Sequence, residues 1–202
     1  MQTPRRTGRA VTDLRSHLWL WTAVAGGVAS DLASKSLLWR HLGGPPETGG
    51  RVLDVLAGWL RLVASRNPGI VFGLEPGAWF NLGPGAGQAV TVVLTVLTAA
   101  LIFYLFAVSD SDSRWTHLAC GIILAGAFGN LYDRVAFGHV RDVFQFTAEV
   151  GGRSLWPFVF NAADVFLVVG VAFLAIRLLL TPHPDEAGNP EAPSEPSPDE
   201  RA

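Results

Sequence analysis

Long runs of hydrophobic residues alternate with polar or glycine- and proline-rich stretches along the chain, and this pattern predicts its elements. Four runs are each close to the ~20 residues that a helix needs to span a membrane. They extend from Leu18 to about Leu38, from Gln88 to Val108, from about Trp115 to Leu131, and from about Phe158 to Leu180. The pattern therefore predicts a membrane all-α protein with four transmembrane helices, in one domain over residues 18–180.

The segments outside these helices differ in character. Residues 39–87 contain too many glycines and prolines to span a membrane, but the run VLAGWLRLVASRN within them alternates as a half-buried strand does. We therefore expect a short amphipathic sheet in an extracytoplasmic extension over 39–87, and a second outer loop over 137–157. Residues 181–202 are rich in Pro, Glu and Ser, so we expect a disordered C-terminal tail.

Charge before the first helix predicts the orientation of the chain. Residues 1–17 include four arginines, which favour the cytoplasmic side of a membrane, and we interpret them as a cytoplasmic N-terminal segment. Four spans return the C-terminus to the same side, so both termini are expected in the cytoplasm. Other arginines fall on the expected outer side, and the orientation therefore depends on this N-terminal segment.

Composition agrees with a membrane protein and excludes several other classes. Half of the residues are hydrophobic, only 16% are charged, and the mean hydropathy is +0.33. The net charge of −2 offers no basic field for a nucleic acid. Cys120 is the single cysteine, so it cannot form an internal disulfide, and one thiol does not make a zinc site.

Polar residues interrupt two of the apolar runs at high density. The run GAFGNLYDRVAFGHVRDVFQF ends one apolar segment, and FNAADVFLVVG begins another. Such groups are costly in a bilayer and mark function by default. Asp142 and Asp164, one from each run, are therefore the first candidates for chemistry. Asp31 and Lys35 lie four residues apart on one helical face, which predicts an ion pair, with Lys35 reaching toward the interface.

Two carboxylates in a low-dielectric site cannot both ionise easily, so they share a proton. One can then act as general base on a water while the other acts as general acid, which is the chemistry of aspartic proteolysis. This mechanism needs no metal and no cofactor. A metal site from His139, Asp142 and Asp133 stays open as an alternative, and Asp133 and Arg134 are expected to belong to a structural ion-pair network.

Three other classes of protein are alternatives. A proton-coupled transporter would place ionisable groups across the bilayer depth, but the second predicted span has none. Another class of intramembrane aspartyl protease carries a G-x-G-D signature, which this sequence lacks. A membrane scaffold with buried ion pairs is compatible with the pattern, but it leaves unexplained why Asn130 precedes Asp133, and Asn161 precedes Asp164, by the same three residues.

Four motifs in order, DLASK, RNPGIVFGL, GAFGNLYDRVAFGHVRD and FNAADVFLVVG, resemble those of bacterial lipoprotein signal peptidases (signal peptidase II). The resemblance implies a four-helix membrane aspartic endopeptidase with an extracytoplasmic β-cradle. It implies that signal peptides are removed from diacylglyceryl-modified prolipoproteins by cleavage just before the lipidated cysteine. It also implies a multi-pass protein of the bacterial cytoplasmic (inner) membrane, with its active site near the outer face.

The resemblance further implies roles for particular residues and partners. Asp142 and Asp164 would be the catalytic pair. Supporting or substrate-contacting roles would fall to Asp31, Lys35, Asn67, Gly129, Asn130, Arg134, Asn161 and Ala163. The expected partners are lipid-modified prolipoproteins and membrane lipids, without nucleic acid, and the expected state is a monomer.

Overall fold

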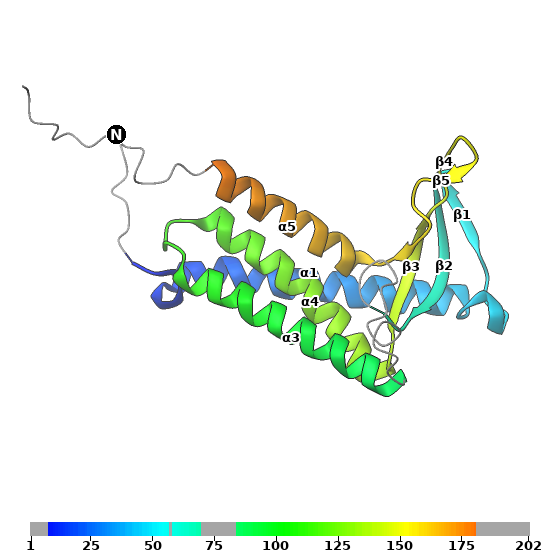
Figure 1. The fold of residues 1–202 in the computed structure, drawn as a ribbon, viewed down its shortest axis with the longest axis horizontal. Coiled ribbons are helices and arrows are strands. Elements are labelled where there is room, and N and C mark those ends of the chain that lie inside the picture. The colour runs from blue at the N-terminus through cyan, green and yellow to red at the C-terminus, as the bar shows by residue number, and fades with distance from the viewer. Residues whose placement is uncertain (1–7, 57, 70–83, 181–202) are drawn as a thin grey trace, which may run out of the picture.

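The computed structural model describes residues 8–56, 58–69 and 84–180, and it places a bundle of four long helices beside a small sheet (Figure 1). The helices are α1 (Leu14–Leu42), α3 (Pro84–Val108), α4 (Arg114–Phe137) and α5 (Ala162–Leu180), with short 3₁₀ turns at Ala10–Thr12 and Pro46–Thr48. Helix α4 packs against each of the other three, so it forms the centre of the bundle. The expected tail over 181–202 lies outside the described residues, as do residues 1–7, 57 and 70–83.

Small residues on α4 let its neighbours approach closely. A Cβ atom at Gly126 would lie 2.5 Å from the carbonyl oxygen of Ala163 on α5, and one at Gly121 would lie 2.6 Å from that of Leu20 on α1. Both distances are too short for real carbon–oxygen contacts, so only glycine permits these helix separations. The close packing of α4 against α1 and α5 brings polar groups from all three helices together near one end of the bundle.

The sheet crosses that end of the bundle, with its strands running across the direction of the helices (Figure 1). Its antiparallel order is β1 (Leu53–Leu56), β2 (Leu60–Asn67), β3 (Val140–Phe146) and β6 (Val159–Phe160). A separate hairpin, β4 (Glu149–Val150) and β5 (Arg153–Ser154), extends beyond it. The small sheet expected from the alternating run is confirmed, and strands from the second outer loop complete it.

The observed helices differ from the expected spans at their ends. Helix α4 continues six residues past Leu131 to Phe137, because Asp133 and Arg134 find polar partners inside the protein, and it ends where Gly138 adopts a left-handed φ of 77°. Helix α5 begins at Ala162 rather than near Phe158, because Phe160 pairs with Phe144 in the sheet. Helix α1 extends beyond the expected span at both ends.

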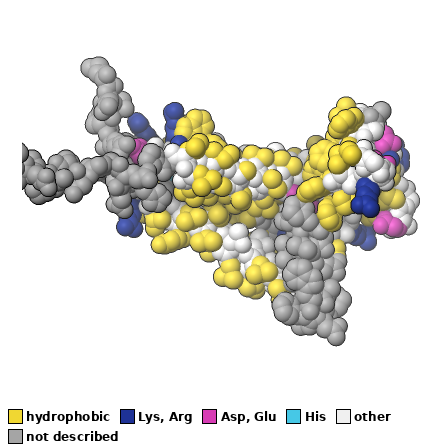
Figure 2. Space-filling view, turned by 45° about the horizontal axis from the view of Figure 1, so that its top comes forward, with side chains coloured by type: hydrophobic (Ala, Val, Ile, Leu, Met, Phe, Trp, Pro, Cys, Tyr) yellow, Lys and Arg dark blue, Asp and Glu magenta, His cyan; other side chains and the backbone are white. Residues whose placement is uncertain are grey.

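Figure 2 shows hydrophobic side chains over the visible face of the helical part, with charged side chains mostly at its two ends. Two helices of the described chain, Gly85–Val108 and Ala162–Leu180, are long and apolar enough to cross a membrane. Helices α1 and α4 are also long, with 29 and 24 residues, but they carry buried polar groups such as Lys35 and Asp133, which lower their hydropathy. Helices α3 and α5 are therefore almost wholly apolar, whereas α1 and α4 supply the buried polar groups of the bundle.

Candidate active site

Asp142 lies on β3, opposite Ser65 of β2, and is 1% exposed. Two asparagine amides donate to its carboxylate: Asn161 Nδ2 to Oδ1 at 2.6 Å and Asn67 Nδ2 to Oδ2 at 2.9 Å. Burial raises the pKa of Asp142 to about 7, and the charge of Asp164 adds to this effect, while the two amide hydrogen bonds oppose it. Asp142 is therefore a carboxyl group that can gain or lose a proton near neutral pH.

Asp164 lies in the first turn of α5, where it takes part in a reciprocal cap. The side-chain oxygen of Asn161 accepts the Asp164 backbone N–H at 3.1 Å, and the Asp164 carboxylate accepts the Asn161 backbone N–H at 3.1 Å. This is the geometry of a capping box, with asparagine and aspartate in place of the usual serine and glutamate. The carboxylate thus lies at the helix N-terminus, where negative charge is stabilised.

Asn161 connects the two carboxyl groups directly. Its oxygen accepts from the backbone of Asp164, so its amide nitrogen is left to donate to Asp142. The Asp164 carboxylate accepts the backbone N–H of the same asparagine, so the two acids, which are 22 positions apart in the sequence, share one residue as a donor. The structure places Asn161 directly before α5, as its N-cap, three residues before Asp164.

A second buried assembly holds Asp164 from the side of α1. Lys35 forms an ion pair with Asp31 at 2.7 Å and donates to Asn130 Oδ1 at 2.9 Å, and Asn130 Nδ2 donates to Asp164 Oδ1 at 2.9 Å. Asp31 in turn accepts the backbone N–H of Ala163 at 2.9 Å, which satisfies a further free donor of the α5 N-terminus. The predicted Asp31–Lys35 pair is confirmed, but Lys35 is fully buried and does not reach the interface.

Gly129 leaves the room that this assembly needs. A Cβ atom at this position would collide with the Asp31 carboxylate and would lie 3.4 Å from the Ala163 side chain. The absence of a side chain on α4 therefore allows the acid on α1 to reach the backbone of α5.

Arg134 holds the chain that follows β2. Its Nη2 donates to the Gly69 carbonyl at 2.7 Å, while the Gly69 N–H donates to Asn67 Oδ1 at 2.9 Å. The second bond occupies the oxygen of Asn67, so its amide nitrogen faces Asp142. Arg134 thereby fixes the turn that orients Asn67.

Asp133 takes part in a network of ion pairs, as expected, because Arg141 Nη2 lies 2.8 Å and Lys35 lies 3.5 Å from its carboxylate. The guanidinium of Arg134 instead donates to backbone carbonyls, those of Asn130 and Gly69. The three residues weighed as a metal site, His139, Asp142 and Asp133, do not form one cluster within the described chain. Burial lowers the pKa of His139, which lies beside the Trp39 ring.

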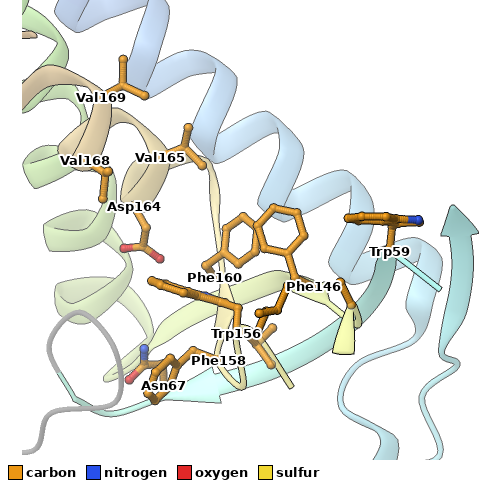
Figure 3. Close-up of a pocket in the computed structure, with 13 residues that line it drawn as sticks. Trp59, Asn67, Phe146, Trp156, Phe158, Phe160, Asp164, Val165, Val168 and Val169 are labelled. Carbon is orange, nitrogen blue, oxygen red and sulfur yellow. The ribbon is translucent and has the colours of Figure 1, made fainter. Parts of the chain in front are cut away.

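An apolar cavity of about 530 Å³ opens in front of Asp164 (Figure 3). The Asp164 carboxylate points toward it, Asn67 lies at one side, and Trp156 and Phe160 stand close by. The remaining wall consists of aromatic and aliphatic side chains of the sheet and α5: Trp59, Phe146, Ala148, Leu155, Phe158, Val159, Val165, Val168 and Val169. Sequence reasoning missed this wall, because its members lie in four separate segments. The Trp and Phe content of the second outer loop was the one available signal.

The eight residues expected beside Asp142 and Asp164 lie within one connected set of contacts around these two acids: Asp31, Lys35, Asn67, Gly129, Asn130, Arg134, Asn161 and Ala163. The arrangement presents two carboxyl groups, three amide donors and an apolar cavity at one end of a helical bundle.

The fold is that of a bacterial membrane enzyme. Two solved structures so described superpose with a TM-score of 0.63 each, at 21% and 22% sequence identity. The matches cover 88% and 90% of this chain, and 93% and 100% of the two solved chains.

The chain belongs to the signal peptidase II family, whose model matches residues 23–180. Lipoprotein signal peptidases of Rhodopirellula baltica and Nitrobacter hamburgensis are 33% and 32% identical to it. These matches cover 96% and 85% of this chain, and 86% and 97% of the two relatives. The chain is therefore a peptidase that removes signal peptides from prolipoproteins, as the resemblance implied.

Proposed function

We propose that Asp142 and Asp164 are the catalytic pair of this peptidase. In this mechanism the ionised member of the pair takes a proton from a water molecule, which attacks the scissile carbonyl carbon. The protonated member donates its proton to the carbonyl oxygen, and the proton taken from the water then passes from the other acid to the leaving amine. The observation that carries the proposal is the position of Asn161, whose side chain donates to the Asp142 carboxylate while its backbone N–H donates to the Asp164 carboxylate.

The titration of Asp142 supports the same assignment. A pair that catalyses in this way must hold one proton between its members, and a carboxyl group with a pKa of about 7 retains a proton at a pH where an ordinary aspartate has lost it. The apparent pKa values of the reaction then belong to the pair rather than to one residue.

We further propose that the substrate reaches the pair through the apolar cavity. A diacylglyceryl-modified cysteine is anchored in the outer leaflet, so the peptide bond just before it is confined to the depth of Asp164. Such anchoring supplies proximity, which can replace much of the entropic cost of a bimolecular encounter. The aromatic wall around Trp156 and Phe160 offers the apolar surroundings that a lipidated peptide needs.

We propose a topology in which the two ends of the helical bundle lie on opposite sides of the membrane. All four helices would cross the bacterial inner membrane, with both termini in the cytoplasm and the sheet at the outer face. The polar groups of α1 and α4 would face the interior, where Lys35 and Asp133 are fully buried, and this avoids their exposure to lipid. The enzyme would act as a monomer surrounded by membrane lipids.

The other eight site residues would support the pair. Asn67, Asn130 and Asn161 would donate to the carboxylates, and Asp31, Lys35 and Arg134 would fix the asparagines or the backbone. Gly129 and Ala163 would give these groups room and a backbone donor.

Cleavage of a synthetic diacylglyceryl-modified prolipoprotein peptide by the purified enzyme tests the pair. Asp142→Asn and Asp164→Asn should each slow cleavage by ~100- to 10,000-fold, because an amide cannot act as general acid or base. Asp54→Asn serves as the control, since this acid is exposed on β1 and pairs with Arg61. Turnover close to wild type by either active-site variant would reject the assignment.

A further inference from the structure

Asp133 and Arg141 form a buried ion pair that joins α4 to the strand carrying Asp142. Arg141 Nη2 lies 2.8 Å from Asp133 Oδ1, and Arg141 Nε lies 3.2 and 3.3 Å from the two carboxylate oxygens. The backbone N–H of Arg141 also donates to Asp133 Oδ2 at 3.0 Å. Asp133 is fully buried, and Arg141 is only 8% exposed.

We propose that Asp133 and Arg141 are positioning residues for the reaction, which hold the first residues of β3 on α4 and thereby place Asp142 opposite Asp164. The inference rests on the proposed catalytic role of Asp142. Neither residue touches the carboxyl groups of the pair, so their effect on the reaction is transmitted through the backbone.

The contacts of Asp133 explain how this placement works. One of its oxygens accepts the peptide N–H of Arg141, the residue directly before Asp142, so the carboxylate ties the strand itself to α4. The guanidinium of Arg141 holds the carboxylate from the side with two nitrogens, which fixes its plane. The guanidinium in turn lies over the Phe137 ring, 4.3 Å from its centroid, and donates to Ser36 Oγ at 3.4 Å.

The same assembly continues to the second carboxyl group. Lys35 lies 3.5 Å from Asp133 and 2.7 Å from Asp31, and Asp31 accepts the N–H of Ala163, the residue directly before Asp164. One line of buried charges therefore runs from the backbone before Asp142 to the backbone before Asp164. It contains two acids and two bases, so its formal charges balance.

If Asp133 and Arg141 only stabilised the fold, their removal would lower stability without lowering the kcat of the folded enzyme. Removing one member of a buried ion pair leaves an uncompensated charge, which lowers stability whether or not the pair matters for catalysis. The test must therefore compare kcat and KM at a temperature where the variant is folded. A positioning role predicts a loss in kcat with little change in KM, because the cavity that binds the substrate is not altered.

The experiment uses the full-length enzyme and the synthetic diacylglyceryl-modified prolipoprotein peptide. Arg141→Met should lower kcat by about 100-fold, the scale expected for a small misplacement of a reacting group, and leave KM unchanged. Asp133→Asn should lower kcat in the same way, and it serves as the second variant if Arg141→Met fails to fold. Arg61→Met is the matched control, since it breaks the exposed Asp54–Arg61 pair of the same sheet.

The variants should also be strongly non-additive. Because both residues act through the same ion pair, the double variant should show no larger decrease in kcat than the more impaired single variant. Wild-type kcat in folded Arg141→Met and Asp133→Asn, or a change confined to KM, would overturn the inference. An active Asp142→Asn enzyme would instead reject the proposed catalytic pair, so the two failures can be told apart.

Discussion

At the residue scale, the site is built from asparagines whose amide orientation is imposed by a partner. The oxygen of Asn67 accepts from Gly69, that of Asn130 from Lys35, and that of Asn161 from the backbone of Asp164. Each amide nitrogen is thereby aimed at a carboxyl group. A neutral donor stabilises a carboxylate without lowering its pKa as far as a cation would, so the pair keeps its ability to exchange a proton near pH 7.

The raised pKa of Asp142 predicts a pH-dependent stability difference. The unfolded chain loses this proton near pH 3.8 but the folded chain only near pH 7, so the contribution of Asp142 to stability falls as pH rises through this window. Asp142→Asn cannot ionise, and we expect its Tm relative to wild type to be higher at about pH 8 than at about pH 5. Thermal melts of both proteins measure this, and an equal difference at both pH values would contradict it.

At the scale of elements, the start of α5 decides where Asp164 lies. Its free backbone donors are capped by Asn161 and by Asp31, which comes from a distant helix. The N-terminus of α5 is therefore held by one residue next to it in the sequence, Asn161, and by one residue that only the tertiary structure brings close, Asp31.

Removal of the α5 cap should affect both stability and chemistry. Asn161→Ala should lower the free energy of unfolding by about 1 kcal/mol, the usual effect of losing an N-cap. It should also reduce kcat, because Asp142 loses a hydrogen-bond donor. Asp13→Ala is the matched control, since Asp13 caps α1 through Ser16 at the other end of the bundle. Cleavage and melting of both variants should show that the control loses stability alone.

Helix separation gives a second prediction at this scale. Gly126→Ala should destabilise the enzyme by roughly 1–3 kcal/mol, because its methyl group would meet the Ala163 carbonyl and the Leu167 side chain and push α5 away. Activity should fall as well, since Ala163 directly precedes Asp164. Gly26→Ala on α1 is the control, because nothing lies within 4 Å of its added Cβ. Equal melting temperatures for the two variants would show that α5 can shift without cost.

At the scale of the whole molecule, the two ends of the helical bundle differ in what they carry. One end carries the sheet, the carboxyl pair and the apolar cavity, while the other end carries the turn between α3 and α4 (Figure 1). At that second end the N-terminal 3₁₀ turn contacts the chain after α3, where Ala10 N–H donates to Ser109 at 2.8 Å. The proposed topology assigns these two ends to opposite sides of the membrane.

Cysteine labelling tests this topology. In a Cys120→Ala background, Ser154→Cys on the β4–β5 hairpin should react with a membrane-impermeant maleimide in intact spheroplasts. Asp112→Cys, in the turn between α3 and α4, should react only after the membrane is opened. Both positions are exposed in the structure, so access to the reagent depends on the side of the membrane. The reverse labelling pattern would reject the proposed orientation.

Much of the fold could be predicted, because the features that define it are local. Apolar runs predicted the helices, and the alternating run before Asn67 predicted β2, whereas the strands between Val140 and Phe160 were expected only as an outer loop. The ends of α4 and α5 were predicted less well. Asp133 and Arg134 look like the end of a membrane span, yet they continue as helix because buried partners satisfy them.

The sequence by itself determined the elements and the residues that carry chemistry, since acids and asparagines inside apolar segments are conspicuous without any knowledge of their contacts. Only the tertiary structure decided how they meet. It paired Asp133 with Arg141, directed Arg134 to the Gly69 carbonyl, buried Lys35, and formed the cavity wall from separate segments. The physical reason is distance along the chain: Lys35 and Asn130 are 95 residues apart, and Asp31 and Ala163 are 132 apart, so packing alone selects these partners.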